Sequence, residues 1–434
     1  MSAPTSEQQH EVNMTAPEAT PRTVLLVSLD WMRPKDPRTT LGHASLLASL
    51  QRAPDLDVRT LSRAVNSPRF DRRELLEAVK RELDSGATDL ALGVYVWNDA
   101  DVKWLLRALR RDGHRARIIL GGPQLSYAAE GLQARYPEAD VLIRGYGEDA
   151  LLHVLSTPPG TPFPGVTLKG QPDLAQQAQV TLAELPSPIL SGVLPIQPFM
   201  RWETQRGCPY ACSFCQHREA GARLKRSRLG EGRVRDELDA LVRGGATDIA
   251  VLDPIFNFNP DATAILERFA ELGYRGKLSL QSRFELLDER FLDACTKLNV
   301  VLEFGLQTVI PSEMKAANRT NKLDKVERAI EELHRRGLHF EVSLIYGLPT
   351  QTLASFEASV QWCVDRGVPV IQAFPLMLLR GTKLEQDRAT WGLVESDDVI
   401  PVVVESDSFS RSDWEQMRAL ADSLAARNAL PSAA

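Results

Sequence analysis

Hydrophobic residues fall in two alternating patterns over the first third of the chain. Short continuous apolar runs are typical of strands buried on both faces of a sheet, and they occur at Thr23–Leu29, Leu90–Val96, Ala116–Leu120 and Asp140–Ile143. Segments with apolar residues every three or four positions predict amphipathic helices near 43–52, 71–84 and 99–111. Strands that alternate with helices predict a doubly wound parallel α/β sheet over residues 21–157.

The same alternation returns after residue 199. Six more strands are predicted at 202–206, 248–252, 278–282, 300–306, 340–346 and 369–376. Amphipathic helical segments lie between them, among them Arg233–Arg243, Ala262–Leu272 and Lys322–Arg336. Six βα units are too few for a closed eightfold barrel, so we predict a partial (β/α)6 barrel of the TIM type over residues 200–385.

Three stretches lack the regular alternation of strand and helix patterns. Residues 1–20 are polar and without periodicity, which predicts a disordered tail. Residues 158–199 are rich in Pro, Gln and Ser and are predicted to link the two domains. Residues 386–434 are acidic and then helical at Trp414–Arg427, which predicts a lid or a packing helix.

Composition narrows the class of protein. A formal net charge of −6 argues against a protein that coats nucleic acid. No apolar run approaches the roughly 18 residues of a membrane span, and the N-terminus lacks the apolar run of a secretory signal. Five cysteines in 434 residues are too few for a disulfide framework. We therefore expect a cytoplasmic enzyme without a nucleic-acid or membrane partner.

Three of the five cysteines lie close together, directly after the first predicted barrel strand, in Arg206-Gly-Cys208-Pro-Tyr-Ala-Cys212-Ser-Phe-Cys215. Barrel enzymes carry their chemistry on the loops at the carboxyl ends of strands. Thiolate ligands favour iron–sulfur clusters, zinc or copper(I). A structural zinc site or a ferredoxin cluster takes four protein ligands, whereas this loop supplies three.

The missing fourth ligand leaves two interpretations. In one, three thiolates hold a 4Fe–4S cluster and the fourth iron stays open for a substrate or cofactor. In the other, Cys295 or Cys363 completes a zinc site or a four-cysteine cluster. Both of these cysteines lie on apolar faces of predicted helices, where a buried structural cysteine is the ordinary role.

The spacing of the three cysteines, with Phe214 just before the third, resembles the defining motif of the radical S-adenosylmethionine (SAM) superfamily. The resemblance implies a 4Fe–4S cluster whose open iron binds the amino and carboxylate groups of SAM. One electron from the cluster then cleaves the sulfonium to methionine and a 5′-deoxyadenosyl radical. A low-potential donor of the flavodoxin or ferredoxin type is the implied source of that electron.

Later strand ends are similar to the same superfamily, in the same order. They are Leu252–Asn259, Gln281–Arg283, Glu303–Gln307 with the following Arg319, Ser343–Pro349 and Leu376–Thr382. The residues that the resemblance assigns to SAM are Phe214, Asp253, Gln281, Arg283, Gln307, Arg319, Ser343 and Met377. A guanidinium such as that of Arg319 suits the methionine carboxylate.

The first domain lacks the G-x-G-x-x-G fingerprint of dinucleotide binding. Glycine-containing segments instead end three successive strands, at Gly93–Asn98, Gly121–Tyr127 and Arg144–Glu148. These segments resemble the cobalamin-binding domain of the cobalamin-dependent class of radical SAM enzymes. The residues implied for cobalamin are Gly93, Tyr95, Gly121, Gly122, Pro123, Gly145, Gly147 and Glu148.

Histidines and a basic run leave alternatives open. Many cobalamin proteins ligate cobalt with the histidine of Asp-x-His-x-x-Gly after the first strand, but the loop Asp30–Gly42 lacks this motif. His43 is either a cobalt ligand or a residue at a helix start, and His217 either acts on the cluster or bonds to backbone. The basic residues Arg218, Arg223, Lys225, Arg226 and Arg228 cover anionic groups or form a solvated face.

The resemblance implies a cobalamin-dependent methyltransferase that acts on an unactivated carbon of a small molecule, such as a secondary metabolite. The same cofactors would also serve transfer of a 3-amino-3-carboxypropyl group, rearrangement, ring contraction or epimerisation. A cobalamin or redox sensor is the non-enzymatic alternative, although the sequence shows no output module such as a helix-turn-helix. The sequence identifies no catalytic residue that contacts the substrate.

Overall fold

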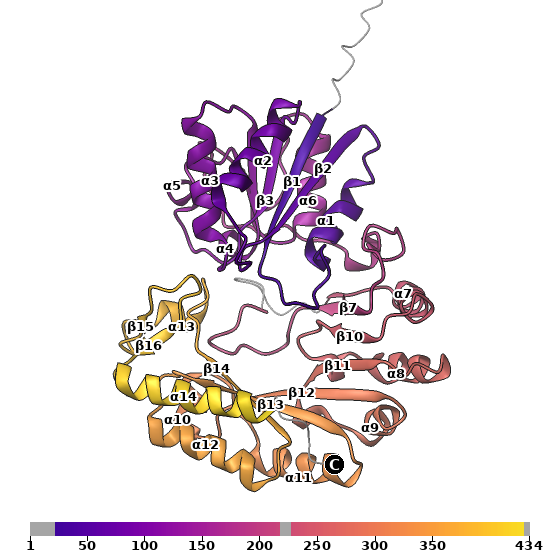
Figure 1. Ribbon diagram of the computed structural model, residues 1–434, viewed down its shortest axis with the longest axis vertical. Coiled ribbons are helices and arrows are strands. Elements are labelled where there is room, and N and C mark those ends of the chain that lie inside the picture. The colour runs from indigo at the N-terminus through magenta and orange to yellow at the C-terminus, as the bar shows by residue number, and fades with distance from the viewer. Residues whose placement is uncertain (1–21, 218–226, 429–434) are drawn as a thin grey trace, which may run out of the picture.

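Two six-stranded sheets, the first parallel except at β6 and the second wholly parallel, form the two main parts of the protein, one above the other in Figure 1. The computed structural model describes residues 22–217 and 227–428. The first sheet has the strand order β2-β1-β3-β4-β5-β6, and the second has the order β14-β13-β12-β11-β10-β7. The predicted fold class, a doubly wound sheet followed by a partial barrel, is confirmed.

Helices cover both faces of the first sheet. Its strands are β1 (Arg22–Asp30), β2 (Leu56–Ala64), β3 (Asp89–Gly93), β4 (Arg117–Gly121), β5 (Val141–Ile143) and β6 (Val166–Leu168). Its helices are α1 (Leu41–Leu50), α2 (Arg72–Asp84), α3 (Asp99–Arg111), α4 (Pro123–Ser126), α5 (Leu132–Arg135) and α6 (Gly147–Ser156). Apolar residues of α2 and α3 pack on one face, and those of α1 and α6 pack on the other. Continuous apolar strands result because both faces are buried.

Two strands of this sheet have no counterpart in the sequence prediction. β2 pairs with β1 along its whole length but lies at the edge of the sheet, and none of its residues is fully buried. An edge strand needs no continuous apolar run, so the pattern did not reveal it. β6 comes from the segment 158–199, predicted as a linker, and pairs antiparallel with β5. The linker therefore also contributes to the first sheet.

The second sheet is an open barrel. Its strands are β7 (Phe199–Trp202), β10 (Asp248–Val251), β11 (Lys277–Ser282), β12 (Asn299–Gln307), β13 (His339–Tyr346) and β14 (Val370–Pro375). Its helices are α7 (Glu231–Arg243), α8 (Ala262–Glu271), α9 (Glu289–Cys295), α10 (Pro311–Ala316), α11 (Leu323–Arg335) and α12 (Leu353–Asp365). Within the described residues β7 and β14 do not pair with each other, so the barrel stays open on one side.

Alternation along the barrel strands separates the core from the interior of the barrel. In β12 and β13 every second residue is a buried apolar side chain, and the residues between them are only partly buried. The apolar set, with Phe304 and Phe340 among its largest members, belongs to one continuous core. The intervening set includes Glu303, Gln307 and Ser343, which line a cavity inside the barrel.

The C-terminal part packs against the barrel. It contains α13 (Lys383–Gln386), the small sheet of β15 (Val394–Glu395) and β16 (Val403–Glu405), and α14 (Arg411–Asn428). α14 contacts β14 and α12 and buries Trp414 and Met417 (Figure 1). The Asn428 side chain donates a hydrogen bond of 2.9 Å to the Ile371 carbonyl in β14. Within the described residues, none of the helices is both long and apolar enough to span a membrane.

The loop 31–40 after β1 ties the first sheet to the barrel. Lys35 forms an ion pair of 2.9 Å with Asp248 at the start of β10, and its ammonium lies 4.2 Å from the ring centroid of Phe199 in β7. Asp36 forms an ion pair of 2.7 Å with Arg201, also in β7. This loop, which lacks the cobalt-ligating motif, therefore contributes to docking of the two domains.

Arg144 provides a test of how the first domain holds its last loops. Its guanidinium donates to the carbonyls of Leu125 and Ala128 and pairs with Asp173, and only 2% of the residue is exposed. We expect Arg144→Met to lower the free energy of unfolding by about 3 kcal/mol, because it leaves a carboxylate and two carbonyls without their hydrogen-bond donor. Denaturant unfolding measures this change. Arg111→Met, at a 73% exposed side chain, is the control and should stay within about 0.5 kcal/mol; an equal loss in both variants contradicts the prediction.

Candidate functional site

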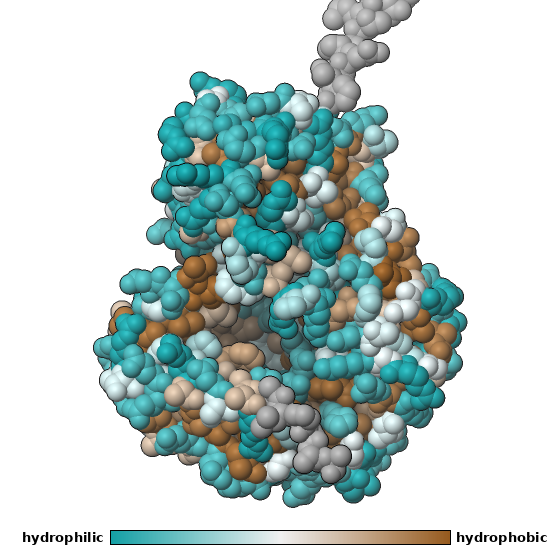
Figure 2. Space-filling model, in the orientation of Figure 1, coloured by the Kyte–Doolittle hydropathy of each residue, from teal (hydrophilic) through white to brown (hydrophobic). Residues whose placement is uncertain are grey.

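The cysteine loop, residues 207–217, follows the short strand β8 (Gln205–Arg206) at the carboxyl end of the first barrel strand. Gly207 has a φ of +89°, a conformation that glycine adopts without strain, and it starts the turn into Cys208. Cys208, Cys212 and Cys215 all line a cavity of about 1120 Å³ inside the barrel, which we call the lower cavity. Figure 2 shows the surface hollowed where the upper and lower bodies of the molecule meet.

The three thiols lie close enough to influence one another. The pKa of the Cys215 thiol is raised to about 11, mainly by burial and also by the nearby Cys212 and Cys208, while a hydrogen bond from the His217 N–H and the charge of Arg319 oppose the shift. Burial likewise raises the pKa of Cys208. Across the described ranges, no group of three or more His, Cys, Asp or Glu side chains is placed to hold a single metal ion. Three thiols on the wall of one cavity are the donors that a 4Fe–4S cluster with one open iron takes.

Neither remaining cysteine reaches this site. Cys295 in α9 and Cys363 in α12 are fully buried in the barrel core, and neither lines the lower cavity. Burial raises the pKa of both thiols to about 12. The structure therefore gives them the ordinary structural role, and it offers no fourth thiolate to the cysteine loop.

Arg319 lies beside the cysteine loop with a donor that has no partner. Its Nη1 is 3.6 Å from the Cys212 Sγ, and its Nη2 donates to the Gly305 carbonyl. Its Nε is buried and has no hydrogen-bond partner within the described part of the chain. An unpaired guanidinium N–H in a cavity fits an anionic ligand such as a carboxylate, which is the role predicted for this residue.

Six more residues predicted for SAM lie on the wall of the lower cavity. They are Phe214, Gln281, Arg283, Gln307, Ser343 and Met377. Gln307 has a φ of +71°, where a residue other than glycine is strained, and it follows a register shift between β12 and β13. Arg283 is only 5% exposed; its guanidinium lies 3.8 Å from the ring centroid of Tyr210 and pairs with Glu285. Arg283 thus supports the cysteine loop as well as the cavity wall.

Asp253 requires a correction. We predicted that it contacts SAM, but its carboxylate is fully buried and does not line the lower cavity. It accepts hydrogen bonds from the backbone N–H groups of Thr204 and Gln205 and from the Thr204 hydroxyl. Burial raises its pKa to about 6, although these hydrogen bonds oppose the shift. Asp253 therefore fixes the chain just before the cysteine loop, and only its neighbours Pro254 and Ile255 reach the cavity.

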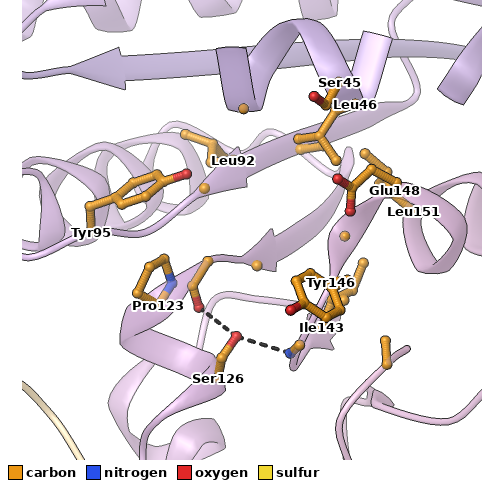
Figure 3. Close-up of a pocket in the computed structure, with 18 of the residues that line it drawn as sticks. Ser45, Leu46, Leu92, Tyr95, Pro123, Ser126, Ile143, Tyr146, Glu148 and Leu151 are labelled. Atoms are coloured by element: carbon orange, nitrogen blue, oxygen red, sulfur yellow. Dashed lines mark hydrogen bonds between the residues drawn. The ribbon is translucent and has the colours of Figure 1, made fainter. Parts of the chain in front are cut away.

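A second cavity, of about 430 Å³, lies at the carboxyl ends of β3, β4 and β5, against the start of α1 (Figure 3). We call it the upper cavity. Strand order reverses between β1 and β3, and sheets of this order bind ligands outside such a switch point. All eight residues predicted for cobalamin line it: Gly93, Tyr95, Gly121, Gly122, Pro123, Gly145, Gly147 and Glu148. The two cavities share Pro123 and Tyr127 in their linings.

Two of these glycines are required by the protein itself. At Gly122, with a φ of +96°, a Cβ would lie 2.7 Å from the backbone of Val94. At Gly145 a Cβ would overlap the backbone of Ala178, which pairs with this loop. Ser126 joins the two loops, since its hydroxyl donates to the Gly122 carbonyl and accepts from the Gly145 N–H (Figure 3). These glycines shape the cavity wall by close packing of backbone segments.

Tyr95 and Glu148 lie on opposite sides of the upper cavity in Figure 3. The Tyr95 ring stacks on Trp97 with ring centroids 4.6 Å apart. Burial raises the pKa of its hydroxyl to about 12, and the carboxylates of Asp30 and Glu148 add to the shift. Asn98 is fully buried and bonds to both Tyr95 and Gly93, so it holds this loop in place. No role for Asn98 was predicted from the sequence.

The described histidines provide no ligand in the upper cavity. His43 is buried, with its Nε2 2.5 Å from the Thr60 hydroxyl in β2, and burial lowers its pKa to about 4. It is therefore a helix residue rather than a cobalt ligand. His217 lines the lower cavity, its backbone N–H donates to the Cys215 Sγ, and burial lowers its pKa. Arg228 pairs with Asp261, whereas Arg218, Arg223, Lys225 and Arg226 lie outside the described residues.

Three charged residues line the lower cavity although the sequence did not predict them as site residues. Glu303 and Glu341 are register partners on β12 and β13, and Arg33 reaches the cavity from the loop after β1. Burial and the neighbouring Glu341 raise the pKa of Glu303. Both glutamates alternate with buried apolar residues, a pattern that places them on the inner wall of a barrel. Nothing in the sequence around Arg33 indicates that its loop reaches the other domain.

Each of the two domains matches a known protein family. Residues 202–363 match the family model of the radical SAM superfamily, and residues 35–155 match that of the B12 binding domain. The chain is 26% identical over 331 residues to a cobalamin-dependent radical SAM methyltransferase, TokK, of Streptomyces tokunonensis, which covers 69% of this chain and 48% of that protein. The chain thus spans about half the length of the curated relatives it matches.

Another curated relative and two solved structures are similar to the chain. A 2-(S-pantetheinyl)-carbapenam-3-carboxylate methyltransferase of Streptantibioticus cattleyicolor is 26% identical and covers 66% of this chain and 46% of its own length. The radical SAM methyltransferase TsrM of Kitasatospora setae, with tryptophan and aza-SAM, superposes with a TM-score of 0.71 at 17% identity, over 93% of this chain and 89% of that one. The structure of OxsB, a cobalamin-dependent SAM radical enzyme with aqua-cobalamin and SAM bound, superposes with a TM-score of 0.66 at 16% identity. The match covers 92% of this chain and 66% of OxsB. At these identities the solved structures show a shared fold.

The corrected role of Asp253 is testable. We expect Asp253→Ala to lower the free energy of unfolding by about 3 kcal/mol, because two N–H groups and a hydroxyl lose a buried charged acceptor. Chemical denaturation under anaerobic conditions measures the change. Asp398→Ala, at an exposed residue, is the control and should have no such effect. Unchanged stability together with weaker SAM binding in Asp253→Ala would restore the original assignment.

Proposed function

We propose that the chain, which matches the family models of the radical SAM superfamily and of the B12 binding domain, is a cobalamin-dependent methyltransferase acting on an unactivated carbon of a small molecule. One observation carries the proposal. A cavity walled by three thiols adjoins the B12 binding domain, and Pro123 and Tyr127 line both this cavity and the upper one. A reaction that needs both cofactors would therefore have them in neighbouring cavities.

The protein's own residues fit the two cofactors. Cys208, Cys212 and Cys215 would hold a 4Fe–4S cluster with one iron open, and the free Nε–H of Arg319 would meet the carboxylate of SAM. When bound, the cluster would supply the electron that cleaves SAM, and cobalamin would supply the methyl group. A flavodoxin- or ferredoxin-type donor would deliver that electron in the cytoplasm, where free thiols persist.

The charges in the lower cavity suggest the substrate's chemistry. The described residues give the side chains of Glu303 and Glu341 no hydrogen bond or ion pair, although the two lie side by side on adjacent strands. Two carboxylates without a direct partner in a partly buried wall repel each other, and the charges of Lys277, Arg33 and Lys35 offset this only in part, since the pKa of Glu303 stays raised. A cation bound between the two carboxylates would remove the repulsion. A substrate with an amino group would relieve this repulsion, and the exposed Phe374 and Met377 would cover its apolar part.

Product analysis tests methyl transfer. Protein reconstituted anaerobically with iron, sulfide and cobalamin is incubated with SAM, a reductant and candidate amines. Methylation gives a product heavier by one CH₂ group, and a label on the methionine methyl appears in that product. Consumption of substrate without transfer of the label rejects methylation in favour of 3-amino-3-carboxypropyl transfer or rearrangement. Absence of 5′-deoxyadenosine under reduction favours a sensor.

The cysteines supply a matched set of variants. We expect Cys208→Ala, Cys212→Ala and Cys215→Ala each to lose the 4Fe–4S absorbance and to lower reductive SAM cleavage at least about 100-fold, because the cluster is the group that reacts with SAM. Iron and sulfide analysis and 5′-deoxyadenosine quantification provide the measurements. Cys363→Ala changes a core cysteine outside the cavity and should keep its iron. Iron loss in Cys363→Ala alone would point to a different ligand set.

A further inference from the structure

Both ends of the cysteine loop are anchored to the wall of the upper cavity. Arg206, two residues before Cys208, reaches out of the barrel and lines the upper cavity. The Tyr127 hydroxyl, from the other domain, donates a hydrogen bond to the Gln216 carbonyl, one residue after Cys215. The three cysteines thus lie between two attachments to the first domain.

The first attachment is a buried ion pair. The Arg206 Nη1 is 2.7 Å from the Glu148 Oε1, and its Nη2 is 2.7 Å from the Glu203 Oε1. Its guanidinium also lies 5.3 Å from the ring centroid of Tyr146. The Arg206 and Glu148 side chains are 17% and 7% exposed. The two carboxylates hold Arg206 charged, and they raise its pKa although burial alone would lower it.

The second attachment involves a residue common to both cavities. Tyr127 lines the upper and the lower cavity, and it directly follows α4, which begins at Pro123. Gly381, after the last barrel strand, has a φ of +71° and packs so closely that a Cβ would overlap the Tyr127 carbonyl. The Gln216 side chain donates a hydrogen bond of 2.7 Å to the Arg380 carbonyl in the same segment. Tyr127, Gln216 and the segment 380–381 therefore form one packed unit.

From this arrangement we infer that Arg206, Glu148 and Tyr127 are positioning residues that couple occupancy of the two cavities: cobalamin in the upper cavity strengthens SAM binding in the lower one, and SAM strengthens cobalamin binding equally. The inference rests on the proposed function for its two ligands. It goes beyond that function because it assigns a coupling role to three residues that neither cofactor prediction requires to act together.

The coupling has a physical basis in water exclusion. With water in the upper cavity, the Arg206–Glu148 pair is partly screened. A ligand that fills the cavity removes this water, so the attraction increases and Arg206 moves less. Because Gly207 is the flexible joint between Arg206 and Cys208, a fixed Arg206 restricts the cysteine loop. The loop then loses less conformational entropy when SAM binds. By thermodynamic linkage, SAM must strengthen cobalamin binding by the same factor.

Binding measurements without turnover test the inference. Protein carrying the oxidised cluster is prepared with and without saturating cobalamin, whose occupancy is read from its absorbance. Equilibrium dialysis with labelled SAM then gives the SAM Kd. We expect cobalamin to lower this Kd by about tenfold in the wild type. In Glu148→Gln and in Tyr127→Phe the ratio should fall to within about twofold, and Arg206→Lys should retain part of it.

The controls remove a different contact between the same two domains. Asp248→Asn also takes one carboxylate from an interdomain ion pair, that of Lys35, but Asp248 lines neither cavity. It should keep the full tenfold ratio. The electron paramagnetic resonance spectrum of the reduced cluster gives a second readout: addition of cobalamin should change it in the wild type and in Asp248→Asn, but not in Glu148→Gln.

The outcomes separate this inference from the proposed function. A wild type that binds both cofactors with a SAM Kd independent of cobalamin overturns the coupling and leaves the function intact. Full coupling in both Glu148→Gln and Tyr127→Phe overturns the assignment of these residues, as does equal loss in Asp248→Asn. A wild type that binds neither SAM nor cobalamin overturns the proposed function, and the coupling with it.

Discussion

Parallel strand pairing places every loop that follows a strand at one edge of its sheet, and this protein turns two such edges toward each other. The start of α1 and the loops after β3, β4 and β5 wall the upper cavity, and the barrel, together with Arg33 from the loop after β1, walls the lower one. Each cavity also takes part of its wall from the other sheet's domain, since Glu203 and Arg206 line the upper cavity and Pro123 and Tyr127 line the lower one. The site therefore depends on a regular feature of backbone hydrogen bonding as much as on any single side chain.

The architecture was readable from the sequence because both sheets impose a strong pattern on it. Strands buried on both faces give continuous apolar runs, and barrel strands give apolar residues at every second position. The edge strand β2 carries neither constraint and was missed. The cysteine spacing also stood out, since three soft ligands within one loop have few structural uses. The eight residues predicted for cobalamin lie together in the upper cavity because each is at the end of a strand or within a few residues of it.

What sequence could not provide is the direction of individual side chains. Asp253 stands at a strand end like its neighbours, yet its carboxylate turns inward to bond Thr204 and Gln205. Arg206 belongs to the barrel by sequence but lines the cavity of the other domain. Gly122 and Gly145 were implied for cobalamin, and the structure shows that their lack of a side chain also serves close contacts with the backbone of Val94 and Ala178. Each case depends on contacts between residues far apart in the chain, which no local pattern records.

The helix α14 has a consequence for handling the protein. β14 ends the open barrel sheet, so its outer edge is a row of backbone groups that another strand could pair with. α14 packs against β14, and Asn428 bonds to the carbonyl of Ile371 in that strand. A fragment shortened before residue 411 would uncover this edge together with the apolar surface beneath Trp414 and Met417. Such a fragment would be prone to self-association through strand addition, even with every cofactor residue intact.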